Sequence, residues 1–282
     1  MAKLRKILGA VSAVALVSTA LTAPVRAEDE APKFGYSITL SVLSDYLFRG
    51  ISLTNNKPQV NPYIELTYGI GYVGFWISNV GDSTDLNFSS LGPVEIDYYA
   101  GIRPTFATLN WDIAALGYTF ESRAPGFSLE DVSYVEFQVK ASKEVVTGLT
   151  VGGAGFITPD QGVNYPFSFT FEGTASYALP KIGIFDPVVS GLIGYTRFES
   201  SPFYSGTPDA EANLANGVFL GEQDYLYWNA GIKLNVDRWF MDFRYADTNI
   251  GDFGLTKENG LPASGLADSR FLFTAGFFLS GP

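Results

Sequence analysis

Apolar and polar residues alternate with a period of two along most of this chain. In the segment 34–49, apolar residues such as Ile38 and Leu40 alternate with polar residues such as Thr39 and Ser41. Successive side chains of a β-strand point to opposite faces, so the pattern predicts a strand with one apolar and one polar face. The segment exceeds the ~5–6 residues of a usual strand and reaches the ~9–11 with which a tilted barrel strand crosses a bilayer.

We divide the chain after residue 27 into twelve such segments, and the connectors between them alternate in length. The longer connectors are 50–57, 81–92, 121–131, 158–166, 199–223 and 248–268. The shorter connectors are 69–71, 104–107, 143–148, 180–187 and 236–238. Outer-membrane barrels combine short periplasmic turns with longer outer loops. The predicted fold class is therefore all-β: a closed antiparallel transmembrane β-barrel of about twelve strands, although ten or fourteen strands also fit the pattern.

Two features of the segments qualify this prediction. The segments 72–80, 149–157 and 188–198 alternate poorly, because they are Gly-rich or apolar on both faces. Aromatic residues gather near the ends of the segments, where a bilayer favours interfacial girdles of amphipathic rings, although aromatic residues favour strands in any protein. The expected girdle residues are Tyr46, Phe48, Tyr68, Tyr72, Trp76, Trp228, Trp239 and Tyr245.

The first 27 residues have the character of a secretory signal peptide. Lys3, Arg5 and Lys6 form a basic start, residues 7–21 are a short apolar stretch, and Val25-Arg26-Ala27 offers small residues to a signal peptidase. We expect residues 1–27 to be cleaved and residues 28–282 to form a single barrel domain. Together with the strand pattern, this leader predicts the outer membrane of a Gram-negative bacterium, with both chain ends in the periplasm.

Composition excludes several classes of function. Four of the 18 basic residues lie in the leader, so residues 28–282 hold 14 basic and 29 acidic residues and a net charge of −15. This balance argues against nucleic acid as a partner. The chain has no Cys and no His, which removes thiol chemistry, His zinc sites and Ser-His-Asp catalysis. We therefore predict no enzymatic activity, no cofactor and no metal site.

Charged residues fall on the polar faces of the segments and are predicted to line the barrel lumen. They are Asp45, Glu65, Glu95, Asp97, Asp112, Glu136, Glu172, Asp242, Arg49, Arg103, Lys140, Lys233 and Arg244. With eight acids against five bases, the lumen should mildly prefer cations. In the alternative interpretation these charges pair with one another and fill a narrow barrel, since wide channels appear at about 16–18 strands.

The sequence therefore leaves two functions open. The first is a porin-like channel for the passive passage of small hydrophilic solutes or ions. The second is a closed structural or surface-interaction barrel, whose acidic outer loops bind divalent ions, lipopolysaccharide or a partner. The acids of these loops include Asp82, Asp85, Asp209 and Glu211, without the spacing of a Ca²⁺-binding loop motif. The 199–223 loop could also fold inward and narrow the pore.

One stretch is more distinctive than the strand pattern. It reads Ser44-Asp45-Tyr46-Leu47-Phe48-Arg49-Gly50-Ile51-Ser52, followed by Asn55 and Lys57-Pro58. With Trp76-Ile77-Ser78-Asn79-Val80, Glu95-Ile96-Asp97-Tyr98-Tyr99-Ala100-Gly101 and Asp268-Ser269-Arg270, it resembles the TorF-type putative porins, a proteobacterial family of conserved hypothetical proteins. The resemblance implies an outer-membrane barrel with a porin role and brings no substrate or catalytic residue. Such a barrel would meet outer-membrane lipid, lipopolysaccharide and the barrel assembly machinery, and its oligomeric state stays open.

The first block also suggests a charge network. Asp45 and Arg49 share the polar face near the outer end of the first segment, where Gly50 begins a loop. Our hypothesis is that they join Glu95, Asp97 and Arg103 on nearby strands. In the alternative, Gly50 merely shapes a turn and the charges are solvated.

Overall fold

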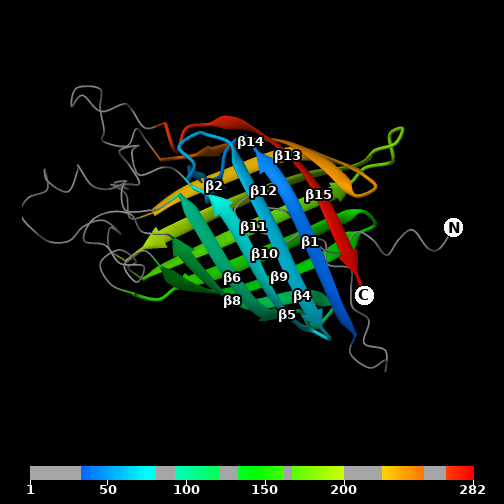
Figure 1. Ribbon diagram of the computed structural model, residues 1–282, viewed down its shortest axis with the longest axis horizontal. Coiled ribbons are helices and arrows are strands. Elements are labelled where there is room, and N and C mark those ends of the chain that lie inside the picture. The colour runs from blue at the N-terminus through cyan, green and yellow to red at the C-terminus, as the bar shows by residue number, and fades with distance from the viewer. Residues whose placement is uncertain (1–32, 81–92, 121–132, 162–166, 200–223, 251–264) are drawn as a thin grey trace, which may run out of the picture.

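The computed structural model describes residues 33–80, 93–120, 133–161, 167–199, 224–250 and 265–282 (Figure 1). The expected signal peptide and most of the acidic outer loops, including residues 200–223 of the 199–223 loop, lie outside these ranges. No helix within the described ranges is long and apolar enough to cross a membrane.

The described residues form twelve long strands and three short ones. The long strands are β1 (Phe34–Leu43), β4 (Gln59–Tyr68), β5 (Gly71–Asn79), β6 (Val94–Ile102), β8 (Leu109–Phe120), β9 (Tyr134–Val146), β10 (Leu149–Thr158), β11 (Ser168–Ala178), β12 (Asp186–Phe198), β13 (Asp224–Val236), β14 (Trp239–Thr248) and β15 (Arg270–Gly281). The short strands are β2 (Leu47–Phe48), β3 (Ile51–Ser52) and β7 (Thr105–Phe106).

The twelve long strands close into one antiparallel barrel. Each pairs with its neighbours in the chain, β1 pairs with both β4 and β15, and β6 pairs with β8. Closure leaves no unpaired sheet edge, which hydrocarbon could not satisfy. The predicted fold and its strand count are therefore confirmed.

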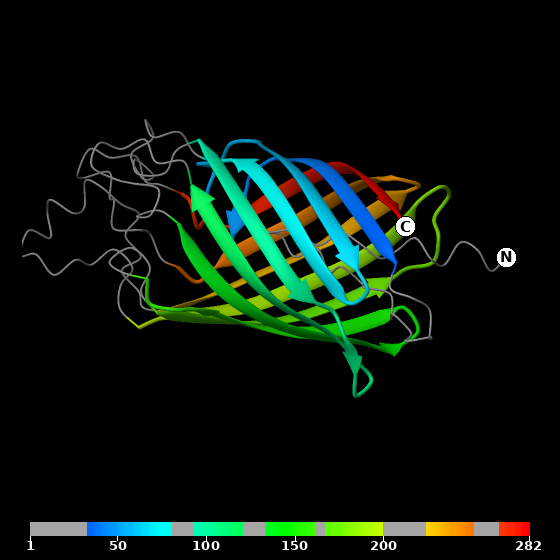
Figure 2. The same cartoon turned by 60° about the horizontal axis from the view of Figure 1, so that its bottom comes forward.

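The two ends of the barrel differ. β1 begins and β15 ends at the same end, since Tyr36 pairs with Gly281. The short turns between β4 and β5, β9 and β10, and β13 and β14 lie at that end, which we call the turn end (Figure 2). We call the opposite end, where the longer connectors leave the strands, the loop end.

The side-chain pattern is that of a soluble protein turned inside out. In β1, Leu40 and Val42 are 50% and 48% exposed, whereas Thr39 and Ser41 are buried. The same alternation of exposed apolar and buried polar residues runs through the other walls, as with Phe137 and Gln138 on β9. Such an apolar outer surface is stable against lipid and not against water.

The predicted aromatic girdle is only partly right. Tyr68, Trp228 and Trp239 are exposed on the outer surface, and Tyr245 contacts the outward-facing Trp228. The prediction was wrong for Tyr46, Phe48, Tyr72 and Trp76, whose rings lie inside the barrel in or against one buried cluster. Period-two alternation misassigned them because some inner faces are aromatic as well.

The first segment is also shorter than predicted. β1 ends at Leu43, and residues 44–58, which we call the inner hairpin, turn into the lumen instead of forming an outer loop. β2 and β3 pair through Leu47↔Ser52 and Phe48↔Ile51. Arg49 and Gly50 both have positive φ, 50° and 86°, the requirement of a tight type I′ hairpin turn.

The inner hairpin explains the segments that alternated poorly. They are confirmed as strands, β5, β10 and β12. Their inner faces carry the buried residues Trp76, Phe156 and Leu192, which pack in the clusters that include Tyr46 or Ile51 of the hairpin. The inner face of such a strand is apolar because it contacts the hairpin and not water.

Candidate functional site

The base of the inner hairpin is fixed by Asp45. Its Oδ1 accepts hydrogen bonds from Ser52 Oγ at 2.6 Å and Thr54 Oγ1 at 2.7 Å. Its Oδ2 forms an ion pair with Arg270 Nη1 at 2.5 Å. Arg270 also donates to the side-chain oxygen of Asn56 and the carbonyl of Gly265. One arginine at the start of β15 therefore holds both the beginning and the end of the hairpin.

Arg270 is a functional candidate that the sequence reasoning missed. It precedes the last strand, and alternation alone did not assign it to the lumen. A signal was available, since Asp268-Ser269-Arg270 is one of the blocks that carry the family resemblance.

The tip of the hairpin reaches the opposite wall. Arg49 Nη2 donates to both carboxylate oxygens of Glu136, at 2.7 and 2.8 Å. Its guanidinium lies 4.8 Å from the ring centroid of Phe48 and 4.9 Å from that of Phe156. Glu136 belongs to β9, which is five strands from β1 through β4, β5, β6 and β8 in a ring of twelve. The hairpin therefore spans the lumen.

Gly50 shows how closely the tip approaches the wall. A Cβ at this position would overlap the side chain of Thr248 at the end of β14 and touch Tyr227 on β13. Glycine is needed here for its positive φ and also for the missing side chain.

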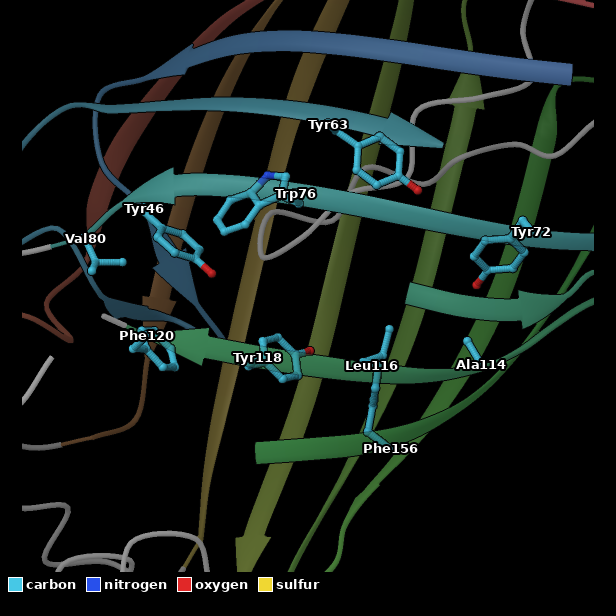
Figure 3. Close-up of a cluster of buried hydrophobic side chains, with 10 residues drawn as sticks. All are labelled: Tyr46, Tyr63, Tyr72, Trp76, Val80, Ala114, Leu116, Tyr118, Phe120 and Phe156. Atoms are coloured by element: carbon cyan, nitrogen blue, oxygen red, sulfur yellow. The ribbon is translucent and has the colours of Figure 1, made fainter. Parts of the chain in front are cut away.

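An aromatic cluster runs along the inner wall of the barrel, from the hairpin at the loop end to Tyr72 near the turn end. Tyr46 packs edge-on against Trp76 with ring centroids 5.3 Å apart, and Phe48 packs likewise against Tyr118 at 5.8 Å. Figure 3 shows Tyr46 between Trp76 on β5 and the side chains of β8. The buried members are Tyr46, Tyr63, Tyr72, Trp76, Val80, Ala114, Leu116, Tyr118, Phe120 and Phe156.

Two carboxyl groups, those of Glu95 and Asp97, contact tyrosines of this cluster or packed against it. Tyr46 donates its hydroxyl to Glu95 at 3.4 Å, and Tyr99 donates to Asp97 at 2.6 Å. Glu95 is 1% exposed and Asp97 is 0% exposed, and each has one carboxylate oxygen, Oε2 and Oδ1 respectively, with no hydrogen-bond partner. Burial and then the charges of Glu95 and Asp97 raise the pKa of Tyr46 well above its usual range, so its hydroxyl acts as a donor.

A second charged cluster lies nearer the turn end. Arg103 donates to the two oxygens of Glu65 at 2.7 and 2.8 Å and to Asp112 at 3.1 Å. Its guanidinium stacks 3.7 Å from the ring centroid of Tyr72, which donates to Asp112 at 2.7 Å. Burial alone would lower the pKa of Arg103, but the hydrogen bonds and charge of Glu65, with Asp112, outweigh burial and raise it.

A third cluster occupies the wall of β12, β13 and β14. Arg244 pairs with Asp242 at 3.0 Å and donates to Asn229 at 2.6 Å and to Ser190 at 3.0 Å. Lys233 lies 4.1 Å from the ring centroid of Phe240.

The remaining two predicted residues have aromatic partners. Lys140 Nζ is 5.4 Å from the ring centroid of Phe156, and Glu172 accepts a hydrogen bond from Tyr227 at 2.6 Å.

None of the thirteen predicted charged residues is exposed, and all lie on inward-facing positions or on the inner hairpin. The hypothesis of one network joining Asp45 and Arg49 to Glu95, Asp97 and Arg103 does not match the observed partners. Asp45 pairs with Arg270, Arg49 pairs with Glu136, and Arg103 pairs with Glu65 and Asp112. The hairpin contacts the acid pair through the hydrogen bond of Tyr46 to Glu95.

The four sequence blocks that carry the resemblance meet at this hairpin. Asp45 contacts Arg270 from the last block, and Tyr46 contacts Trp76 from the second and Glu95 from the third. Within the described ranges, no group of three or more acidic, His or Cys residues could hold a metal ion.

Comparison with known proteins gives a family for the chain. A sequence model of Gcw_chp, described as a bacterial protein of unknown function, matches residues 27–201. The chain belongs to this family. No curated protein matches it.

Solved structures similar to this Gcw_chp protein are outer-membrane barrels. The NanC porin matches with a TM-score of 0.50 and 7% identity over 88% of this chain and 100% of that one. The COG4313 outer membrane channel from Pseudomonas putida F1 matches with a TM-score of 0.41 and 11% identity over 90% and 97% of the two chains. At such identities the likeness concerns the fold alone. With its closed barrel and exposed apolar belt, this Gcw_chp protein is a transmembrane β-barrel of the bacterial outer membrane.

Proposed function

We propose that this Gcw_chp protein is a narrow channel for the passive passage of small hydrophilic solutes or ions, with the inner hairpin as its constriction and a mild preference for cations. The observation that carries the proposal is the charged turn-end half of the lumen. There the side chains of Arg103 and Asp112 are each 17% exposed and that of Asp242 is 15% exposed, so they are not sealed by packing. The resemblance to the TorF-type putative porins supports the same role.

The cation preference follows from the balance of charge. Adding Arg270 to the thirteen predicted residues gives eight acids and six bases around the lumen and hairpin. Charges lining a narrow passage set its ion selectivity at close range. The absence of His and Cys from the chain supports a passive, non-catalytic role.

A closed barrel is the second candidate, and the packing of the loop-end half favours it. Tyr46, Thr54, Trp76 and Glu136 are each 1% exposed, which is the burial of a protein core. In that case the acidic outer loops would carry the function, by binding divalent ions, lipopolysaccharide or a partner.

Reconstitution in a planar bilayer distinguishes the two candidates. We expect the wild-type protein to insert with discrete conductance steps, and a salt gradient across the bilayer should give a reversal potential of the sign for cations. Repeated insertions without conductance would reject the channel and leave the closed barrel.

A matched pair of variants tests the source of the selectivity. Asp112→Asn removes a charge that faces the lumen, and should move the reversal potential toward zero. Asp186→Asn removes an acid that is 53% exposed at the same end and pairs with Lys181, and should leave the reversal potential unchanged. Equal effects of both variants would contradict the assignment of selectivity to the lumen.

A further inference from the structure

Glu95 and Asp97 differ from the other buried acids of the described residues in their partners. Asp45, Glu65 and Glu136 each have an arginine partner. Glu95 and Asp97 receive hydrogen bonds from tyrosine hydroxyls instead. Two ionised carboxylates without a cation, sealed from water, would carry a large desolvation cost.

The two carboxyl groups are neighbours on one strand. Glu95 and Asp97 lie two residues apart on the same buried face of β6. Each has an oxygen that is buried and lacks a partner. A single proton between the carboxyl groups would supply the missing donor and halve the charge of the pair.

Among the described residues, no arginine or lysine forms an ion pair with Glu95 or Asp97. The titratable groups that face the pair are Tyr46 of the hairpin, Tyr99 of β6 and Tyr118 of β8. Trp76 of β5 pairs in register with Asp97 and cannot ionise at these pH values. Arg49, which acts on Tyr118, is engaged with Glu136. Because both unpartnered oxygens are sealed, a hydrated metal ion has no access to them, whereas a proton needs no space.

We propose that Glu95 and Asp97 form a proton-binding site, and that the proton they share holds the inner hairpin closed through Tyr46. The closed form binds the proton more tightly than a form in which the hairpin has left and water reaches both carboxylates. Closure is therefore complete at low pH and is lost as rising pH removes the shared proton. The proton site stands on the contacts alone, whereas its role in regulating conductance rests on the proposed channel function.

Thiol labelling tests the coupling of proton and hairpin. The chain has no Cys, so a single Leu47→Cys substitution places one thiol in β2, where the native side chain is 3% exposed. The measured quantity is a ratio: the maleimide labelling rate of Leu47→Cys divided by that of Lys57→Cys, an exposed position of the same hairpin. The ratio cancels the pH dependence of thiol reactivity itself. Between about pH 5 and about pH 9 we expect this ratio to rise, by up to about tenfold per pH unit for one linked proton.

Three substitutions locate the effect. In Glu95→Gln and Asp97→Asn backgrounds the shared proton is no longer needed, so the ratio should lose its pH dependence. Glu172→Gln is the matched control, since Glu172 also accepts a hydrogen bond from one tyrosine, Tyr227, and it should keep the wild-type dependence. A ratio that does not change with pH in the wild type, or that changes equally in all four proteins, overturns the proposal.

Infrared spectroscopy of the wild-type protein gives a readout that survives misfolding of the variants. A buried protonated carboxyl group should show a C=O stretching band at neutral pH that shifts in D₂O and disappears at high pH. Absence of this band overturns the proton site. Neither readout needs ion flow, so a protein that labels as expected but does not conduct rejects the channel function alone.

Discussion

The two halves of the lumen use charge in opposite ways. At the loop end, the inner hairpin fills the space with aromatic rings, and its ion pairs bind it to the barrel wall, as Arg49 binds Glu136. At the turn end, Arg103 and Arg244 pair with acids of their own and neighbouring strands, and Arg103, Asp112 and Asp242 stay partly accessible. Charged residues with similar spacing along the strands therefore have different roles: at the loop end they hold the hairpin in the lumen, and at the turn end they line the lumen.

The most direct way to break this comparison is to remove the hairpin. Replacing residues 46–56 with a short Gly-Ser linker should raise single-channel conductance several-fold, because the turn-end half would then set the resistance. Shortening the turn at 182–185, which lies outside the lumen at the other end, should leave conductance unchanged. Conductance that stays at the wild-type value without the hairpin would show that the constriction lies elsewhere.

The ion pair at the hairpin tip should have the largest effect on stability. Arg49→Ala leaves Glu136, which is 1% exposed, without its cation, and should cost about 3–5 kcal/mol in the free energy of unfolding. Lys181→Ala breaks an ion pair that is 54% and 53% exposed at the turn end, and should cost about 0–1 kcal/mol. Urea unfolding of the folded barrel in detergent measures both, and similar losses would mean that the tip is solvated.

Two glycines test how closely the hairpin tip approaches the barrel wall. Gly50 and Gly183 both have positive φ, but a Cβ at Gly183 would meet nothing within 4 Å, whereas one at Gly50 would meet Thr248 and Tyr227. Gly183→Ala should cost about 1–2 kcal/mol from backbone strain alone. Gly50→Ala should cost about 1–3 kcal/mol more because the hairpin tip must move. Equal losses in urea unfolding would contradict the contact of the tip with the wall.

The smallest expected effect comes from replacing an arginine at the turn end with a lysine, which keeps the positive charge and changes the shape of the cationic group. Arg103→Lys keeps the charge but loses the two hydrogen bonds to Glu65 and the stacking on Tyr72, and should cost about 1–2 kcal/mol. Arg238→Lys changes an exposed arginine in another turn at the same end of the barrel and should have almost no effect. The reversal potential should be retained in both variants, and its loss in Arg103→Lys would mean that geometry, and not charge, sets selectivity.

Much of the lumen could be predicted because strands alternate strictly. Residues such as Glu136 on β9 and Arg244 on β14 lie on the polar face of a clear period-two pattern, and both are buried in the barrel. The partners of these residues could not be predicted, since a strand pattern places a residue on a face without saying which distant strand it meets. Arg49 and Glu136 are 87 residues apart, and Asp45 and Arg270 are 225 apart.

The sequence by itself determined the barrel and its apolar outer surface, because these depend on local periodicity and on the absence of free edges in a membrane. Only the tertiary structure decided that residues 44–58 turn inward and that Tyr46 and Trp76 pack against each other inside the barrel. The physical reason is that an aromatic side chain gains similar burial from lipid outside a wall and from a packed hairpin inside it. Closure of the barrel decides which of these two environments each ring occupies. It brings β1, β5, β9 and β15 around one interior.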